Sequence, residues 1–340
     1  MAPCDLFDEP FAAGDGPRCS GRYRGVRFVL IFILCGIASS VSAQVPSQGE
    51  DARATQAGNS RPDEVIAESR NLTGATDRFV ATVVSPVDGR GGALWRDRVC
   101  VGVVNLQAEA ARALADRVLD WAHNLGVEVG EPSCVPNVWV VATDNGDETS
   151  RELVSARPRD FRLGVSGADP GGTALRRFQT SRQPVRWWHV SLPVDSATGL
   201  PLSRLPGQEP SGFSGSELAR PQEFGENSTT GQASRLSNSS RDDLKLVIIV
   251  MDTVAFDTAT FGQVSDYVAM VALAQISPDA ETGEFDTILN IFAAGARAPH
   301  TLTVWDRAFL SGLYRAQQGS RNPGRNLDAV ADAMHRSLTE

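Results

Sequence analysis

The sequence predicts a mixed α/β domain: a mixed sheet with a crossover helix, a buried central helix and a helical C-terminal part. Two observations predict it. Short, strongly apolar runs, typical of buried strands, occur at 99–104, 135–142 and 244–251. Apolar residues between the first two runs recur at steps of three or four, as in a helix. Strands joined by a helix of this length form a parallel βαβ unit, because a parallel pair needs a long crossover.

The first residues are typical of an export signal. Three arginines precede an apolar run at 28–37, and small residues follow it up to Ala43. A basic region, about ten apolar residues and a small-residue cleavage position characterise secretory signal peptides. The run is shorter than the ~20 residues that span a bilayer. We therefore expect 1–43 to be an N-terminal extension and signal peptide, with a true start inside it. Cleavage near Ala43 would leave a secreted or periplasmic chain with no membrane span.

The composition divides the rest of the chain. Residues 44–77 are rich in Ser, Gly, Gln, Asp and Glu, which predicts a flexible leader. The stretch 195–243 is rich in Pro, Ser and Gly and predicts a disordered insert. The remaining residues within 78–320 suffice for a single domain. A C-terminal helix is expected in 321–340. The net charge of −9 argues against a nucleic-acid partner.

Apolar spacing predicts the elements of the domain in chain order. An alternating, β-branched pattern predicts a strand at 79–84, and periodic apolar residues predict a helix at 108–125 that ends at Gly126. The later predicted elements are a short helix at 151–156, a strand at 184–192, a central strand at 244–251, a buried helix at 263–276, and helices at 302–317 and 326–338.

After the expected cleavage, the chain keeps Cys100 and Cys134 as its only cysteines. In an oxidising compartment such a pair predicts one disulfide. Cys100 lies at the start of the first strand of the βαβ unit, and Cys134 lies just before the second. The starts of adjacent parallel strands are neighbours, so a bridge needs no unusual geometry. Two buried free thiols are the alternative.

Residues 244–315 resemble the C-terminal part of metzincin-like metallopeptidases. The strand at 244–251 leads into a helix containing Asp266–Gln275, and the apolar turn 287–292 stands where the Met-turn would be. Then follow Leu302-Thr303-Val304-Trp305-Asp306 and a last helix with Leu313-Tyr314. The order of the preceding elements is also that of the zincin N-terminal subdomain. The chain is similar to secreted proteobacterial proteins with a degenerate zincin-like fold that lacks the HExxH motif.

The resemblance implies a zinc site, and the sequence lacks its chemistry. The family has two histidines one helical turn apart and a glutamate beside the first, which activates the zinc-bound water. Aligned on Ala272-Leu273, the equivalent positions hold Tyr267 and Val271 for the ligands, Val268 for the base, Ser277 for the third ligand, and Ile288 or Leu289 for the methionine. The resemblance therefore implies a pseudo-peptidase with no metal and no cofactor.

Trp187 and His189 are candidate binding residues. Strand alternation places them on one face, with Trp188 on the other. In zincins the strand near the active-site helix often lines the substrate groove, so this face could bind a ligand. Packing of the tryptophans in the core is the alternative.

Carboxylates offer an enzymatic alternative. Asp252 ends the central strand, a common position for functional residues in α/β sheets. Asp266, Asp257 or Asp306 could form a pair with it, and a pair can do acid–base work if burial raises one pKa. The simpler hypothesis is that Asp252 caps the turn after its strand and that Asp306 caps or anchors the last helix.

These observations lead to one main expectation. The chain is expected to be a secreted, non-catalytic binding or interaction protein on a degenerate metallopeptidase-like scaffold, with a protein or peptide ligand in the envelope. Two alternatives stay open. One is a metal-independent hydrolase that uses carboxylates around Asp252 and Asp266. The other is a zinc protein with non-standard ligands such as His189, His300 and Asp252.

Overall fold

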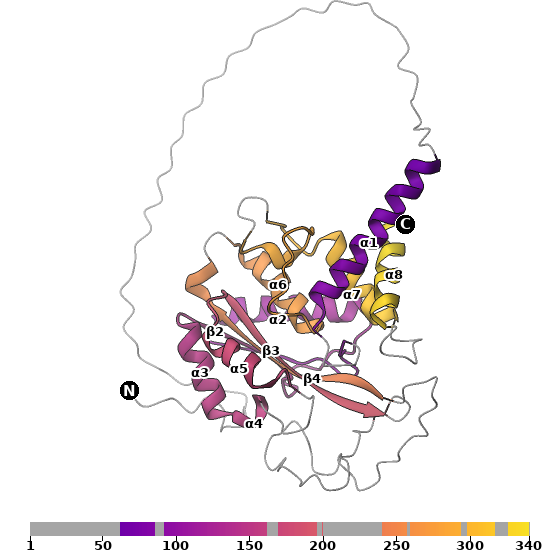
Figure 1. The fold of residues 1–340 in the computed structure, drawn as a ribbon. Helices are drawn as coiled ribbons and strands as arrows, with labels where there is room; N and C mark the ends of the chain where they lie inside the picture. Colours follow the sequence, from indigo (N-terminus) through magenta and orange to yellow (C-terminus); the bar gives the residue numbers. More distant parts are fainter. Residues whose placement is uncertain are drawn as a thin grey trace, which may run out of the picture. The chain divides into compact units, whose positions relative to one another are not determined.

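Figure 1 shows the fold of the chain as a computed structural model. It describes residues 62–85, 92–161, 169–195, 199, 240–256, 259–293, 298–316 and 326–339. The expected export signal and nearly all of the expected insert lie outside these ranges. Within them, no helix has the length and apolar character needed to cross a membrane.

The core of the fold is a mixed sheet. Its strands are β1 (Val101–Val104), β2 (Val138–Thr143), β3 (Val185–Asp195) and β4 (Ser240–Asp252), in the order β1-β2-β4-β3. β1, β2 and β4 run parallel, and β3 pairs antiparallel with β4. The predicted mixed α/β fold is confirmed. The most apolar strand, β4, lies inside the sheet as predicted. Its side chains are covered on both faces, which agrees with its apolar sequence.

The predicted βαβ unit is also confirmed. Helix α2 (Ala108–Asn124) joins β1 to β2, and the register pairs Val101 with Val138. The helix buries Leu114, Val118 and Ala122, which recur at steps of four and so share one face. Gly126 follows it with a φ of 76°, a conformation that glycine adopts without strain.

Helices cover both faces of the sheet (Figure 1). On one face, α2 and α6 (Phe261–Leu273) share a large apolar cluster with β2 and β4. On the other face, α3 (Gly146–Ala156), α4 (Pro158–Phe161) and α5 (Gly171–Thr180) contribute to a smaller cluster around Trp188. Side chains of β4 alternate between the two clusters, as expected for a strand buried on both faces.

Helix α6 is the buried central helix that the sequence predicts. Every residue from Gln263 to Leu273 is buried. It begins with a capping box in which Thr260 and Gln263 satisfy each other's backbone groups. A helix that is apolar all round needs packing on all sides, and α6 lies between the sheet and the C-terminal elements.

The C-terminal part is helical, as predicted. The short turns η1 (Thr253–Phe256) and η2 (Ile288–Asn290) flank α6 in sequence. They are followed by α7 (Val304–Ala316) and α8 (Asn326–Thr339). Gly312 of α7 lies so close to α8 that an added Cβ would sit 3.0 Å from a backbone oxygen, which explains the small residue there.

The structure corrects the expectations for the start of the domain. Helix α1 (Pro62–Val83) includes most of the predicted strand at 79–84 and the last part of the predicted flexible leader, 44–77. Phe79, Val80 and Val83 fit helical spacing as well as alternation, and the helix buries all three. The ring of Phe79 contacts those of Phe285, Trp305 and Phe309. This packing holds the segment in a helix.

The ends of the predicted insert, 195–243, belong to the sheet. β3 and β4 pair along their whole length, from Val185 opposite Met251 to Asp195 opposite Ser240. The intervening residues therefore connect the two strands of an antiparallel hairpin. The predicted disorder concerns 196–239, of which only Gly199 is among the residues with a described position.

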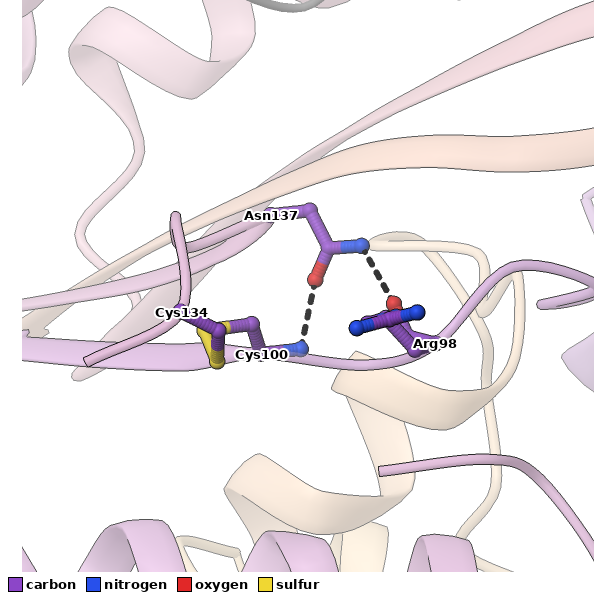
Figure 2. The surroundings of a disulfide bond; sticks show 4 residues. All are labelled: Arg98, Cys100, Cys134 and Asn137. Atoms are coloured by element: carbon purple, nitrogen blue, oxygen red, sulfur yellow. Dashed lines mark hydrogen bonds between the residues drawn. A yellow bond between two sulfur atoms is a disulfide. The ribbon is translucent and has the colours of Figure 1, made fainter. Parts of the chain in front are cut away.

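The predicted disulfide joins Cys100 and Cys134. Figure 2 shows a second link beside it: the Asn137 side chain accepts a hydrogen bond from the Cys100 N–H at 2.8 Å and donates one to the Arg98 carbonyl at 2.9 Å. A covalent bond and a side-chain clamp thus hold the start of β1 against the start of β2.

Candidate functional site

The positions that the zincin resemblance assigns to metal ligands and base lie in the core. Tyr267 is 7% exposed, and Val268 and Val271 are fully buried. The Tyr267 ring packs edge-on against Trp187 and Phe292, with centroid distances of 6.0 and 5.2 Å. Burial raises the pKa of the Tyr267 phenol, so it stays neutral. A neutral phenol and two aliphatic side chains fill the place where ligands would point.

The third ligand position and the Met-turn position are likewise structural. The Ser277 N–H donates to the Val83 carbonyl at 2.8 Å, which ties the segment after α6 to the end of α1. Ile288 is fully buried in the same apolar cluster as α6, and Leu289 packs against that cluster. A backbone hydrogen bond holds Ser277, and apolar packing holds Ile288 and Leu289.

Trp187 and His189 share a face of β3, as the alternation predicts, and both are only 4% exposed. His189 Nε2 lies 2.8 Å from the Val271 carbonyl of α6. Burial lowers the pKa of His189 to about 4, although this hydrogen bond favours the charged form. The Trp187 indole donates to the Ile276 carbonyl at 3.0 Å. On the opposite face, the Trp188 indole donates to the Phe161 carbonyl at 3.1 Å. All three side chains fasten the edge strand to its neighbours.

Asp266 belongs to an ion pair between α6 and α2. Its carboxylate has no exposed side-chain area and accepts from Arg117 at 2.6 and 2.8 Å. The Trp121 indole donates to the same carboxylate at 2.9 Å. Burial by itself would raise the pKa of Asp266, but hydrogen bonds from Arg117, Thr301 and Trp121 hold it below its usual value. Such a carboxylate stays ionised and does not suit a general acid.

Asp252 caps the chain after β4. Its Oδ2 accepts from the Gly146 N–H at 3.1 Å, at the start of α3, and its Oδ1 accepts from the Val254 N–H at 3.3 Å. The capping hypothesis for Asp252 is therefore confirmed. The nearby Arg186, 4% exposed, forms an ion pair with Asp147 at 2.9 Å. Gly146 leaves room for this arginine, because a Cβ there would lie 2.9 Å from Nη2 of Arg186.

The structure does not pair the two carboxylates of the hydrolase hypothesis. Asp266 bonds to α2 on one face of the sheet, and Asp252 bonds to α3 on the other. Asp257 lies outside the described residues. The non-standard zinc site is not assembled either: among the placed residues, no three His, Cys, Asp or Glu side chains are arranged to hold a metal ion. His189, His300 and Asp252 therefore do not form a ligand set.

Asp306 anchors the last helix, as predicted, and does more. It forms a capping box with Thr303: the Thr303 N–H donates to Asp306 Oδ2 at 2.9 Å, and the Asp306 N–H donates to Thr303 Oγ1 at 3.1 Å. The same carboxylate accepts from the Thr287 hydroxyl at 2.5 Å and the Ile288 N–H at 2.8 Å. Burial raises the pKa of Asp306, and these hydrogen bonds oppose the rise. One side chain thus joins η2 to α7.

Sequence reasoning missed the partners of these acids. Arg117 and Trp121 are four residues apart on α2, so they share a face and can reach one carboxylate together. Arg186 follows Val185 and precedes Trp187 inside a buried strand, and a charge in such a run needs a partner. Both signals were available from spacing and burial alone.

No family model, curated protein or solved structure matches this chain. The function therefore has to be argued from the placement of its own side chains.

Proposed function

We propose that this chain is a secreted, periplasmic interaction protein that keeps a metallopeptidase-like scaffold without its catalysis. One observation carries the proposal. Tyr267, Val268 and Val271, which stand at the implied ligand and base positions, are 7%, 0% and 0% exposed and packed into the core. Zinc sites need imidazole, thiolate or carboxylate ligands with an open position for water. An apolar helix face offers neither.

Contacts of the residues that carry the resemblance support a retained scaffold. Asp306 bonds to both η2 and its own helix, and the Tyr314 hydroxyl donates to the Leu273 carbonyl at the end of α6 at 2.7 Å. These contacts stabilise the fold whether or not a metal is bound. A chain could therefore keep the L-T-x-x-D and L-Y residues after losing its zinc ligands.

The disulfide supports a location outside the cytosol. Disulfides persist in oxidising compartments such as the periplasm. The Cys100–Cys134 bridge agrees with the export signal that the sequence predicts before Ala43. The proposed location and the proposed interaction function are compatible with an envelope partner.

A hydrolysis assay tests the non-catalytic proposal. The mature chain, 44–340, is assayed against peptide, ester and glycoside substrates beside Asp252→Asn, Asp266→Asn and Asp120→Asn, the last a control on the exposed side of α2. We expect no turnover above the buffer rate for any of the four. Turnover that Asp252→Asn or Asp266→Asn abolishes would overturn the proposal, provided that Asp120→Asn retains it and the inactive variant unfolds at the wild-type urea midpoint.

A further inference from the structure

The sheet has two edge strands, β1 and β3, and the outer edge of β1 faces no other strand among the described residues. β1 is first in the order β1-β2-β4-β3, and its inner edge pairs with β2. An unpaired strand edge presents a row of backbone donors and acceptors that can pair with another chain. What the outer edge of β1 offers therefore depends on which of its residues point outward.

The hydrogen bonds around Cys100 fix which residues face outward. The Cys100 carbonyl accepts from the Val138 N–H at 3.0 Å, so Cys100 faces β2. Val99 faces the other way: its N–H donates to the Glu128 carbonyl, and its carbonyl accepts from the Gly130 N–H, both at 2.8 Å. Backbone direction alternates along a strand, so Val101 and Val103 also face outward. Within the described part of the chain, their backbone groups have no hydrogen-bond partner.

The chain itself begins a fifth strand at this edge and then leaves it. Val129 forms a single parallel bridge with Val99. The chain then turns: the Cys134 N–H donates to the Glu131 carbonyl at 3.0 Å, and Ser133 has a φ of 70°. The disulfide in Figure 2 brings Cys134 back to Cys100. The segment after Gly130 is thereby held at the start of β1, and no other described segment pairs with Val101 and Val103.

The edge of β1 is short, but it lacks two other features that usually protect an edge, namely charged residues and proline. Val101–Val104 has the sequence VGVV, with no charge and no proline, and its side chains are half-buried. Val135, 71% exposed, precedes Pro136, which packs against Gly102. An exposed apolar side chain therefore adjoins in sequence the residue that contacts β1. β-branched side chains of this kind favour apolar cross-strand partners.

We propose that the outer edge of β1 binds a short extended peptide segment of a partner protein, which adds a fifth strand to the sheet. The peptide continues the line that Glu128–Gly130 begins. Backbone groups of Val101 and Val103 supply the hydrogen bonds, and their side chains select apolar residues at alternate peptide positions. This inference rests on the proposed interaction function and specifies its ligand class.

The length of the edge favours a peptide over a second copy of the chain. Four residues span about 13 Å at the usual rise of a strand. A stable protein interface buries about 800 Å² on each partner, which four residues at an edge do not supply. A short peptide needs no such area, because strand addition draws on main-chain hydrogen bonds.

Two substitutions at Val103 distinguish the contribution of its outward N–H from that of its side chain. Val103→Pro removes the outward donor and spares the pairing with β2, since proline is tolerated where the N–H of an edge strand faces solvent. Val103→Thr keeps the N–H and the branched shape. The mature chain, 44–340, is used to select binders from a phage library of random eight-residue peptides. We expect enrichment of peptides with alternating apolar residues that bind wild type and Val103→Thr alike, and bind Val103→Pro about tenfold or more weakly. Failure to enrich any peptide, or equal binding to a folded Val103→Pro, would overturn the proposal.

Amide hydrogen exchange keeps the test independent of that variant. In the free chain we expect fast exchange at Val101 and Val103 and slow exchange at Gly102 and Val104, whose amides face β2. A selected peptide should slow the first pair. Slow exchange at Val101 and Val103 without peptide would mean that the edge is already covered, which overturns the proposal. So would a concentration-dependent dimer, detected by light scattering, that shows the same protection. The metal and hydrolysis assays test the proposed function and do not depend on peptide binding or amide exchange. Failure of the proposed function can therefore be distinguished from failure of this inference.

Discussion

Asp266 and Arg117 form a bidentate ion pair that joins the buried helix α6 to α2, with N···O distances of 2.6 and 2.8 Å. The two side chains differ in environment: that of Asp266 is 0% exposed, and that of Arg117 is 41% exposed. The buried carboxylate therefore needs the arginine to balance its charge, whereas water can solvate the arginine if the carboxylate is removed.

Arg117→Ala should destabilise the chain, because it leaves a buried carboxylate with the Trp121 indole as its main donor. Removing one partner of a buried pair costs about 3 kcal/mol. Urea unfolding at pH 7 measures the change. Arg117→Ala combined with Asp266→Asn should be less destabilised than Arg117→Ala alone, since no charge remains buried. A double variant that is less stable than both single variants would contradict this account of the pair.

His189 should make stability depend on pH. Its pKa is lowered to about 4 in the folded chain, below the value of ~6.5 in an unfolded one. The unfolded chain therefore takes up a proton first as the pH falls. The stability linked to neutral His189 is complete above pH ~6.5 and is lost progressively down to pH ~4.

Between pH 7 and pH 5, this linkage should remove about 2 kcal/mol from the free energy of unfolding. Urea titrations at the two pH values measure it. His189→Gln should abolish most of the difference, whereas His300→Gln, at an exposed loop position, should leave it intact. An unchanged pH dependence in His189→Gln would assign the effect to other groups.

Asp306 should tolerate an amide far better than truncation. Asp306→Ala leaves the Ile288 and Thr303 N–H groups buried without an acceptor, at a cost of roughly 3–5 kcal/mol. In Asp306→Asn the amide oxygen can accept from both, and the Thr287 hydroxyl can accept from the new NH₂. The expected cost is about 1 kcal/mol. Thermal unfolding of the two variants compares them, and equal destabilisation would contradict the anchoring role.

The disulfide should stabilise the chain by closing a loop. Cys100 and Cys134 are 34 residues apart, and the chain-entropy model then gives about 4 kcal/mol. Cys100→Ser with Cys134→Ser should lower the free energy of unfolding by that order, and a reductant should then have no further effect. Wild-type chain that unfolds at the same urea concentration with and without reductant would contradict the prediction.

The sequence predicted the strands and helices of the βαβ unit well, because their apolar periodicity has one interpretation. Leu114, Val118 and Trp121 recur at steps of four and three, which fits a helix and not a strand. The segment 79–84 allowed two interpretations, because Phe79, Val80 and Val83 fit the period of a strand and that of a helix. Contacts with Phe285 and Phe309, more than 200 residues away, favour the helix. Local pattern contains no information about such partners.

The candidate site was likewise predicted only in part. Alternation placed Trp187 and His189 on one face correctly, but it could not show that α6 covers that face. Strand position suggested Asp252 as a functional residue, whereas its role depends on the Gly146 N–H, which lies 106 residues away in the chain. Periodicity gives the direction of a side chain, and the opposing element decides its exposure.

The central claim is that the scaffold works without a metal, and the most direct test is metal content. Residues 44–340 are expressed and purified without chelator, and their zinc content is measured by mass spectrometry against protein concentration. The account predicts less than about a tenth of an equivalent per chain, because the implied ligand positions hold Tyr267 and Val271 in a packed core. One equivalent of zinc that survives dialysis would contradict it.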